Sequence, residues 1–343
     1  MAFEGFPFII GWELTLVCNL RCRHCGSSAG MPRVRELTLE ESLAICDQFP
    51  ALLVQEVNFT GGEPLLRPDW QKICSHLGEL GISTKILTNG LTLGSDTVAA
   101  MKDLGIAGVG ISLDGLESTH DHIRGHVGLF RCALAGIKRV QNADIPITVI
   151  TTVNALNLTE LPSMFTLLRS MGINRWQIQP ISPQGRAHKY AELHLTEEAY
   201  MQLGTFVKQW EPLAEEIGLK IRPSDNFGYF TEMDTREPPW RGCSAGLFSC
   251  GITSDGKIKG CISLPDEIIE GDLRQHDLWD IWFHPDSFAY TRQFSIKKLG
   301  SACHSCDKAE QCHGGCSAMS YGSRGSFHDN PYCFYGIKMK SLR

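Results

Sequence analysis

Short apolar segments alternate with helix-like segments over roughly the first 217 residues of this chain of 343. Each apolar segment is bounded by Gly, Pro, Asn or Asp, a pattern that predicts strands. We expect strands at 9–16, 56–59, 84–87, 108–113, 147–153 and 175–181. Helices are expected from Thr38, where Glu41 completes a capping box, and then at 69–80, 95–104, 128–143, 158–171 and 196–217.

Six strand–helix units in a row predict a parallel sheet, which right-handed crossovers curl into a barrel-like wall. Because eight such units close a barrel, six are too few. We therefore expect an α/β fold with an open, partial (β/α)6 TIM-like barrel over residues 1–220. Active sites of such barrels collect at the C-terminal ends of the strands, so the chemistry is expected there.

The pattern changes after about residue 220 of the chain. Residues 223–241 are loop-like, and the segment from Ile252 to Ile258 predicts a β-hairpin with an Asp255-Gly256 turn. Beyond the loop, cysteines dominate and apolar periodicity weakens, so bound metal is expected to hold this part together. We expect residues 221–343 to comprise a linker and a metal-rich domain.

Composition and charge narrow the class of protein. A hydrophobic fraction of 43% and a charged fraction of 20% are ordinary for a globular protein. The formal net charge of −6 gives no support for a nucleic-acid or anionic-membrane partner. No run of 18 apolar residues and no secretory signal is visible, so we expect a cytoplasmic protein without a membrane span.

The chain contains fourteen cysteines, and eleven of them fall into two clusters near its two ends. In a reducing compartment, metal ligation fits these clusters better than disulfide bonding. The three remaining cysteines, Cys46, Cys74 and Cys132, lie in helix-like segments. We expect them to be buried as small hydrophobic side chains.

The N-terminal cluster is Cys18, Cys22 and Cys25, a CxxxCxxC motif directly after the first expected strand. Three thiolates can ligate three irons of a [4Fe–4S] cluster and leave the fourth iron open. The motif resembles that of the radical S-adenosylmethionine (radical SAM) enzymes, in which the open iron chelates the amino and carboxylate groups of S-adenosylmethionine. The alternative is a zinc site, which needs four ligands and for which His24 would supply the fourth.

Motifs after later strands match the same family. Its GGEP motif stands here as Gly61, Gly62, Glu63 and Pro64, and the resemblance implies contacts with the methionine amino group. It further implies cosubstrate contacts, including the carboxylate, ribose and adenine, from His24, Thr88, Asn89, Ser112, Arg124 and Ile181, with Pro180 beside the last. An arginine suits a carboxylate because it makes bidentate pairs. Taken singly, the glycines predict only a strand-ending turn, and Arg124 a surface ion pair.

The C-terminal cysteines resemble the SPASM domain, which holds two auxiliary [4Fe–4S] clusters. The matching layout is Cys303-x2-Cys306-x5-Cys312-x3-Cys316, preceded by Cys243 and Cys261 and followed by Cys333. With Cys250, eight thiolates are present. The resemblance implies that one cluster takes Cys243, Cys250, Cys261 and Cys316, and the other Cys303, Cys306, Cys312 and Cys333. The alternative is a pair of zinc ribbons.

Two departures from related enzymes bear on the substrate. Sulfatase-maturing members carry a catalytic Asp after the third cysteine of the first auxiliary site, whereas Ile262 follows Cys261 in this chain. A sulfatase maturase is therefore not expected. Only 17 residues precede Cys18, too few for the N-terminal peptide-recognition domain of many peptide-modifying members. A peptide substrate would need a separate recognition protein or would dock on the barrel.

The resemblance implies a radical SAM oxidoreductase with three [4Fe–4S] clusters, S-adenosylmethionine and an electron donor such as flavodoxin or ferredoxin. It would abstract a substrate hydrogen and oxidise or crosslink the substrate, in the first place a ribosomally made peptide. The alternatives are a small molecule such as an aminocyclitol or sugar alcohol, and, in another class, a non-catalytic zinc- or iron-binding interaction protein. The sequence assigns no catalytic acid or base, and Glu13, Asp114, Asp225, Tyr229 and Tyr321 are candidates for substrate contact.

Overall fold

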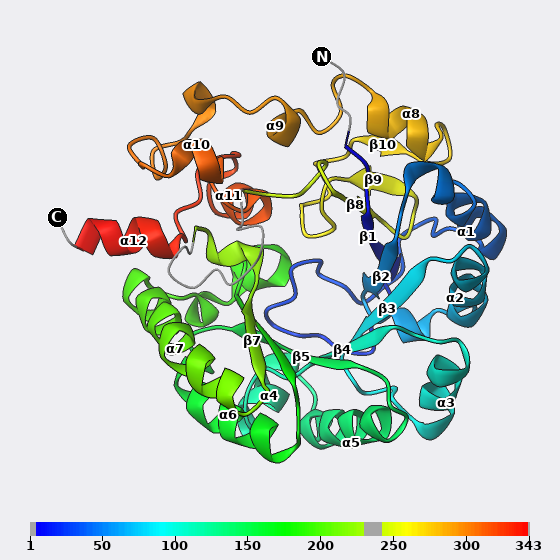
Figure 1. The fold of residues 1–343 in the computed structure, drawn as a ribbon, viewed down its shortest axis with the longest axis horizontal. Helices are drawn as coiled ribbons and strands as arrows, with labels where there is room; N and C mark the ends of the chain where they lie inside the picture. The colour runs from blue at the N-terminus through cyan, green and yellow to red at the C-terminus, as the bar shows by residue number, and fades with distance from the viewer. Residues whose placement is uncertain (1–4, 230–241, 342–343) are drawn as a thin grey trace.

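The computed structural model describes residues 5–229 and 242–341, which are built around one ten-stranded sheet (Figure 1). Its strand order is β10-β9-β8-β1-β2-β3-β4-β5-β6-β7, so β10 and β7 form the two edges. All neighbouring pairs from β8 through β1 to β7 are parallel. Strand β9 pairs antiparallel with both of its neighbours, β8 and β10. The strands are β1 (Ile9–Thr15), β2 (Glu56–Gly61), β3 (Ser83–Thr88), β4 (Gly108–Ser112), β5 (Ile147–Val153), β6 (Arg175–Pro180), β7 (Lys220–Pro223), β8 (Ser249–Ile252), β9 (Lys257–Lys259) and β10 (Gly271–Asp272).

Helices cover the outer side of the curved sheet, and the last third of the chain lies across its open side (Figure 1). The helices of the barrel are α1 (Leu39–Cys46), α2 (Trp70–Glu79), α3 (Ser95–Asp103), α4 (Glu117–Arg124), α5 (Leu129–Asn142), α6 (Leu161–Ser170) and α7 (Glu197–Glu216). Those of the last third are α8 (Leu278–Phe283), α9 (Ala289–Arg292), α10 (Ala309–Cys312), α11 (Ser317–Arg324) and α12 (Phe334–Ser341).

One hydrophobic core joins the barrel to the C-terminal part. It contains barrel residues such as Trp12 and Trp176, and also Trp282 and Phe334 from the last third. The packing of α12 on α7 is so close that a side chain at Gly204 would meet the Phe334 ring at 1.9 Å. The C-terminal part therefore contributes more apolar packing than its sequence pattern indicates.

The expected fold class is confirmed: an α/β protein with a parallel, unclosed barrel-like sheet. All six expected strands are present to within two residues at each end, and the hairpin is present as β8 and β9, in which Ile252 pairs with Ile258. Thr38 caps α1 and forms the expected capping box with Glu41. The division into two domains at residue 220 stays a prediction. The sheet itself runs across this boundary, since β1 of the first part pairs with β8 of the second.

One expectation needs correction, and two elements were not expected. Cys132 is exposed and not buried, because it lies on the outer face of α5, whose inner face carries Leu129, Ala133 and Ile137. Cys46 and Cys74 are buried as expected. The barrel has a seventh parallel strand, β7, where only six were expected, and α4 follows β4. None of the described helices combines the length and the apolar character that a membrane crossing requires.

Candidate functional site

The loop after β1 carries Cys18, Cys22 and Cys25 and is fixed at its two ends. The Glu36 carboxylate accepts hydrogen bonds from Thr15 Oγ1 at 2.8 Å and from the Leu16 backbone N–H at 2.7 Å. Arg186, which follows β6, donates to the carbonyl oxygens of Cys22 at 2.8 Å and Ala29 at 2.6 Å. These contacts hold the cysteine loop over the C-terminal ends of the strands.

The three thiols of this loop lie close to one another. Cys22 interacts electrostatically with both Cys18 and Cys25, and burial raises the pKa of Cys22 to about 11. Cys18 and Cys25 pack against the small apolar cluster of Leu20, Cys22 and Leu129. All fourteen cysteines are free thiols, so three grouped sulfur donors are available to an iron–sulfur cluster, as the chemistry of such ligands requires.

The zinc alternative for this loop finds no support in the geometry. His24, its proposed fourth ligand, directs Nε2 to Asp114 Oδ2 at 3.2 Å. Within residues 5–229 and 242–341, no three His, Cys, Asp or Glu side chains are grouped so that they could hold a single metal ion. A closed four-ligand zinc site is therefore not formed by this triplet and His24.

The GGEP segment ends β2 against the tail of β1. A side chain at Gly61 would lie 2.2 Å from the Thr15 carbonyl oxygen, and one at Gly62 would lie 2.0 Å from that of Val17. The backbone N–H groups of Gly62 and Glu63 donate to these same two oxygens at 2.9 and 2.8 Å. Only glycine permits this approach, and Pro64, two residues after Gly62, is buried. The segment is thus part of the wall beneath the cysteine loop.

Glu63 is fully buried and braces the ends of two strands. Its carboxylate accepts hydrogen bonds from Thr88 Oγ1 and the Asn89 backbone N–H, both at 2.8 Å. Burial outweighs these hydrogen bonds and raises the pKa of Glu63 to about 7. Asn89 in turn donates to Asn19 at 2.8 Å, inside the cysteine loop. Glu63, Thr88 and Asn89 therefore position the loop of Cys18.

A buried group of charges lies where β4 ends. Arg124 Nε donates to Asp114 Oδ2 at 2.7 Å, and the Thr152 backbone N–H donates to Asp114 Oδ1 at 2.8 Å. The Arg124 guanidinium and His24 hold the pKa of Asp114 well below its usual range, against the effect of burial. His24 keeps its buried Nδ1 without a hydrogen-bond partner among the described residues. Arg124 has five N–H donors, so its bond to Asp114 leaves it able to bind a second carboxylate.

A cavity of about 990 Å³ opens over these strand ends. The expected cosubstrate residues that line it are His24, Gly61, Ser112 and Arg124, with Pro180 and the first-cluster ligand Cys25. The others lie behind the lining: Gly62, Glu63, Pro64, Thr88, Asn89 and Ile181. Of the candidate substrate contacts, Glu13 and Tyr321 line the cavity and Asp114 does not. Tyr229 is buried elsewhere, with its hydroxyl donating to Gln311, and the Asp225 side chain lies outside what the structure describes.

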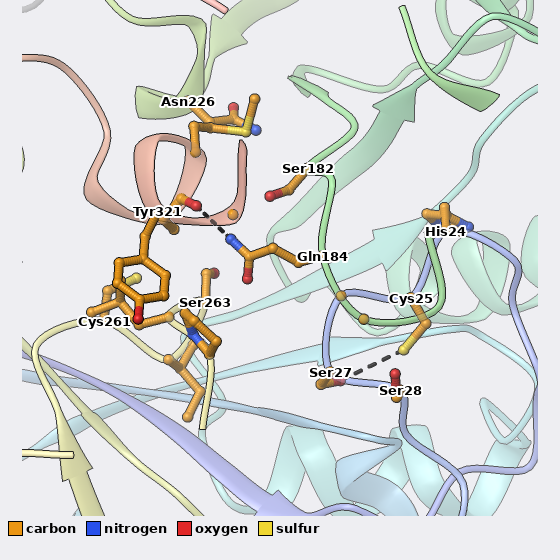
Figure 2. A pocket seen from close by; sticks show the side chains of 18 of the residues that line it. His24, Cys25, Ser27, Ser28, Ser182, Gln184, Asn226, Cys261, Ser263 and Tyr321 are labelled. Atoms are coloured by element: carbon orange, nitrogen blue, oxygen red, sulfur yellow. Dashed lines mark hydrogen bonds between the residues drawn. The ribbon is translucent and has the colours of Figure 1, made fainter. Parts of the chain in front are cut away.

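The opposite wall of the cavity belongs to the C-terminal part. Cys261 and Cys316 line it together with Ser263 and Tyr321. Figure 2 shows His24 and Cys25 at one side of the pocket, Cys261 and Tyr321 at the other, and Ser182 and Gln184 between them. The structure thus brings one cysteine of the N-terminal triplet and two of the C-terminal group to the same cavity.

The eight C-terminal cysteines lie in two groups. Cys316 interacts electrostatically with Cys243 and Cys261, and Cys250 with Cys261. Cys312 interacts with Cys303, Cys306 and Cys333. Burial raises the pKa of Cys303 to about 11, and it raises those of Cys250, Cys312 and Cys316 further. Each group offers four sulfur donors, which matches the ligand number of a cubane cluster.

A network of charges closes the cavity wall between the two halves of the chain. Arg33 donates to Glu13 through Nε at 2.5 Å and to Asp266 through Nη1 at 2.8 Å. Lys259 donates to Asp266 at 2.6 Å, and Ser254 donates to Glu13 at 2.9 Å. The two cations hold the pKa of Asp266 at about 2. Each Arg or Lys that lines the cavity among the described residues, namely Arg33, Arg124 and Lys259, thus has a carboxylate partner.

Sequence reasoning missed several residues of the cavity wall. Ser182 and Gln184 directly follow β6, so the rule that sites collect at strand ends could have found them. Ser182 Oγ is buried without a hydrogen-bond partner in the described part of the chain. Arg33 and Lys259 gave no local signal, because contacts across more than two hundred residues bring Arg33 to Asp266.

Comparisons with known proteins agree with this geometry. Residues 12–168 match the family model of the radical SAM superfamily, and residues 243–307 match that of SPASM, an iron–sulfur cluster-binding domain. The chain is 30% identical to the AdoMet-dependent heme synthase of Methanosarcina barkeri over 98% of both proteins. It is 29% identical to the mycofactocin maturase MftC of Mycolicibacterium smegmatis, over 92% of this chain and 79% of the relative.

Solved structures share the fold. Streptococcus suis SuiB bound to S-adenosylmethionine superposes with a TM-score of 0.77 at 20% identity, over 96% of this chain and 76% of SuiB. The protein anSMEcpe with bound AdoMet also gives a TM-score of 0.77, at 14% identity, over 97% of this chain and 92% of that protein. At these identities the likeness concerns the fold alone.

Proposed function

The chain belongs to the radical SAM superfamily and carries a C-terminal SPASM domain, and on that premise we propose that it oxidises or crosslinks a peptide at a C–H bond. The observation that carries the proposal is the single cavity that reaches Cys25 at one side and Cys261 and Cys316 at the other. A substrate in this cavity lies between the site that starts radical chemistry and a group of thiols suited to an electron-accepting cluster.

When bound, the first [4Fe–4S] cluster and S-adenosylmethionine would supply a radical able to remove a hydrogen atom from the substrate, and an auxiliary cluster would supply an acceptor for the second electron. We propose three clusters, held by the N-terminal triplet and the two C-terminal groups. The protein orients the cosubstrate through Arg124 and Ser112, which line the cavity. His24 contributes its buried, unpartnered Nδ1 as a hydrogen-bonding group for the nucleoside.

In this proposal the remaining predicted residues do not contact the cosubstrate themselves but support the residues and the loop that do. Gly61 and Gly62 allow β2 to pack on the tail of β1. Glu63, Thr88 and Asn89 hold the loop of Cys18 through the hydrogen bonds described above. Asp114 keeps Arg124 oriented from behind the cavity wall. A loop held this firmly places its thiols before iron arrives, which favours assembly of the cluster.

The polar lining of the cavity supports a peptide substrate. Side-chain amides and hydroxyls such as Gln179, Ser182, Gln184, Ser224 and Asn226 line it, and these groups match the donors and acceptors of peptide backbone. The three cations of the described lining already have carboxylate partners. A substrate rich in carboxylates would have to displace the partners of Arg33 and Lys259 or compete with the cosubstrate for Arg124. The similarity to mycofactocin maturase MftC also supports a peptide.

A second candidate is a porphyrin, and one observation favours it. The full-length similarity at 30% identity is to a heme synthase, and heme is a porphyrin with propionate side chains. A cavity of about 990 Å³ is at the upper end for ligand pockets and offers space for a large substrate beside the cosubstrate. The carboxylate partners of Arg33 and Lys259, and the assignment of Arg124 to the cosubstrate, speak against tight binding of propionates. An aminocyclitol or sugar alcohol remains compatible with the hydroxyl-rich wall.

The proposed reaction also needs partners. An electron donor such as flavodoxin or ferredoxin would reduce the first cluster. A separate recognition protein would present the peptide unless the peptide docks on the barrel directly. We propose a cytoplasmic location, because eleven of the fourteen cysteines are proposed as cluster ligands and such use of cysteine fits a reducing compartment.

The test uses anaerobically reconstituted protein. Parent protein is expected to hold about twelve iron and twelve sulfide per chain, and a Cys18/Cys22/Cys25→Ala variant about eight. With dithionite and S-adenosylmethionine, release of 5′-deoxyadenosine should be stimulated by a pool of defined peptides more than by Fe-coproporphyrin III or by a cyclitol. Stimulation by the porphyrin alone would refute the peptide proposal. An unchanged iron content in the triple variant would refute the assignment of the first cluster.

The electron-acceptor role is tested by Cys261→Ala, with Cys132→Ala as its matched control because Cys132 is exposed and lies outside all three groups. Cys261→Ala should still release 5′-deoxyadenosine but form less oxidised product, since the electron of the substrate radical has lost its acceptor. A well-folded Cys261→Ala protein that makes product at the parent rate would leave the auxiliary groups as scaffold only.

A further inference from the structure

The hydroxyl of Tyr290 is buried without a hydrogen-bond partner among the described residues. Tyr290 lies in α9, and its ring stacks on Phe327 with centroids 4.3 Å apart and an interplanar angle of 9°. The hydroxyl occupies the space beside Gly260, where a side chain would come within 2.0 Å of it. The stacked ring therefore holds this hydroxyl beside Gly260, the residue that directly precedes Cys261 in the chain.

The surroundings of the hydroxyl are the thiols of one C-terminal group. Tyr290 interacts electrostatically with Cys243, Cys250 and Cys261, and also with Glu270. A phenol hydroxyl carries its proton at neutral pH, so the group is a donor. Buried hydroxyls of tyrosine ordinarily have a partner. A cluster bound by these thiols would therefore also supply the acceptor that the Tyr290 hydroxyl lacks.

We propose that the Tyr290 hydroxyl donates a hydrogen bond to a sulfur atom of the iron–sulfur cluster held by Cys243, Cys250, Cys261 and Cys316, and thereby raises its reduction potential. Hydrogen bonds to the sulfurs are among the factors that set the potential of such clusters. A donor stabilises the reduced state more than the oxidised state, because the reduced cluster carries one more negative charge. The inference rests on the proposed assignment of this cluster.

The consequence concerns the electron that leaves the substrate radical. Cys261 and Cys316 line the cavity, whereas Tyr290 does not. Tyr290 therefore acts through the cluster as a positioning residue, and it sets how readily the cluster accepts an electron without touching the substrate. Gly260 is needed for the same arrangement, because the side chain of any larger residue there would displace the Tyr290 hydroxyl.

The experiment is a redox titration of reconstituted holoprotein, followed by electron paramagnetic resonance, on parent and Tyr290→Phe protein. The Cys18/Cys22/Cys25→Ala background isolates the auxiliary signals. Tyr290→Phe should shift one auxiliary midpoint to a more negative potential and leave the other unchanged. Tyr335→Phe is the control, since the Tyr335 hydroxyl already donates to Asp307 at 2.7 Å, and it should leave the midpoint of the Tyr290 cluster unchanged. Unchanged auxiliary midpoints in Tyr290→Phe protein with full iron content would overturn the inference.

A second variant keeps the test decisive if Tyr290→Phe impairs cluster assembly. Gly260→Ala retains the hydroxyl but pushes it aside, so it should shift the same midpoint in the same negative direction. Proton hyperfine spectra of the parent protein should show coupling between the cluster and a nearby exchangeable proton. This coupling should be weaker in Gly260→Ala. An unchanged midpoint in Gly260→Ala would refute the inference. Absence of auxiliary iron from the parent would refute the proposed function as well, and iron analysis distinguishes these two failures.

Discussion

Replacement of Arg124 by alanine is the most direct test of how the cavity holds its cosubstrate. Arg124 Nε donates to Asp114 Oδ2 at 2.7 Å, and the two side chains are 9% and 0% exposed. The same arginine lines the cavity beside Ser112. The substitution therefore removes two interactions at once: the partner of a buried carboxylate inside the protein, and the proposed partner of the cosubstrate carboxylate.

The structural part of the effect follows from the burial of Asp114. Removal of one partner from a buried ion pair costs about 3–5 kcal/mol, because a buried charge is left uncompensated. Asp114 keeps the Thr152 N–H at 2.8 Å and His24 at 3.2 Å, so we expect a loss of stability near the lower end, about 3 kcal/mol. Arg131→Ala is the matched control. Its ion pair with Glu117 is largely exposed, and its loss should cost less than about 1 kcal/mol.

The binding part is measured separately. Truncation of one partner of a buried charge pair costs about 2–5 kcal/mol, which corresponds to a roughly 30-fold to several-thousand-fold rise in the Kd for S-adenosylmethionine. Anaerobic isothermal titration of reconstituted holoprotein gives the Kd, and thermal unfolding of the same samples gives the stability. Arg124→Lys should recover only part of the affinity, because lysine keeps the charge but not the bidentate geometry.

Asp114→Asn distinguishes a direct contact from an indirect one. It keeps Arg124 in the cavity wall while it removes the charge behind it. If Arg124 contacts the cosubstrate, Asp114→Asn should lose less affinity than Arg124→Ala, because its amide oxygen can still accept from Arg124 and keep it oriented. Parent-like affinity in Arg124→Ala would show that Arg124 only supports the fold. Equal losses in both variants would show that the effect passes through the shape of the loop and not through a contact.

The barrel was predictable because its signals are local. Strands such as β5 alternate buried and half-buried positions along their length, and the capping box of α1 lies within four residues. By contrast, α4 carries a single aliphatic position, Ile123, among charged and polar residues, so it has no apolar periodicity. The last barrel strand, β7, is four residues long and ends at a proline on the edge of the sheet, where sequence patterns are weakest.

The C-terminal part shows where local patterns mislead. Its sequence looks poor in core positions, yet Trp282, Phe288 and Phe334 join the hydrophobic core of the barrel. Strand β8 gains its partner from β1, more than two hundred residues away. A buried position of this kind cannot be recognised from its neighbours in sequence, because the surface that buries it lies at the other end of the chain.

The candidate site likewise has features that local sequence predicts and features that depend on contacts between distant residues. Cysteine spacing is local, and the structure places the thiols in three groups; that each group holds a cluster stays a prediction. The cavity wall is not local, because it depends on contacts such as Arg33 with Asp266 and Ser254 with Glu13. Sequence reasoning could therefore predict the chemistry of the site but not the polar surface that faces the substrate.

Two further predictions concern stability. Cys312→Ala should expose the segment around the Cys303, Cys306 and Cys333 group to limited proteolysis while the barrel resists, since that group is expected to need its cluster for order; equal protection in this variant and in Cys132→Ala would contradict it. His120 accepts a hydrogen bond on Nδ1 from the Asp114 backbone N–H at 2.9 Å, and burial lowers its pKa to about 4 from 6.5. Because the folded state holds this histidine neutral, its contribution to stability is present above pH 6.5 and is lost as the pH falls toward 4. His120→Asn keeps an acceptor but cannot titrate in this range, so unfolding measured across that interval should depend less on pH in the variant than in the parent. Parallel pH profiles would show that His120 does not carry the dependence.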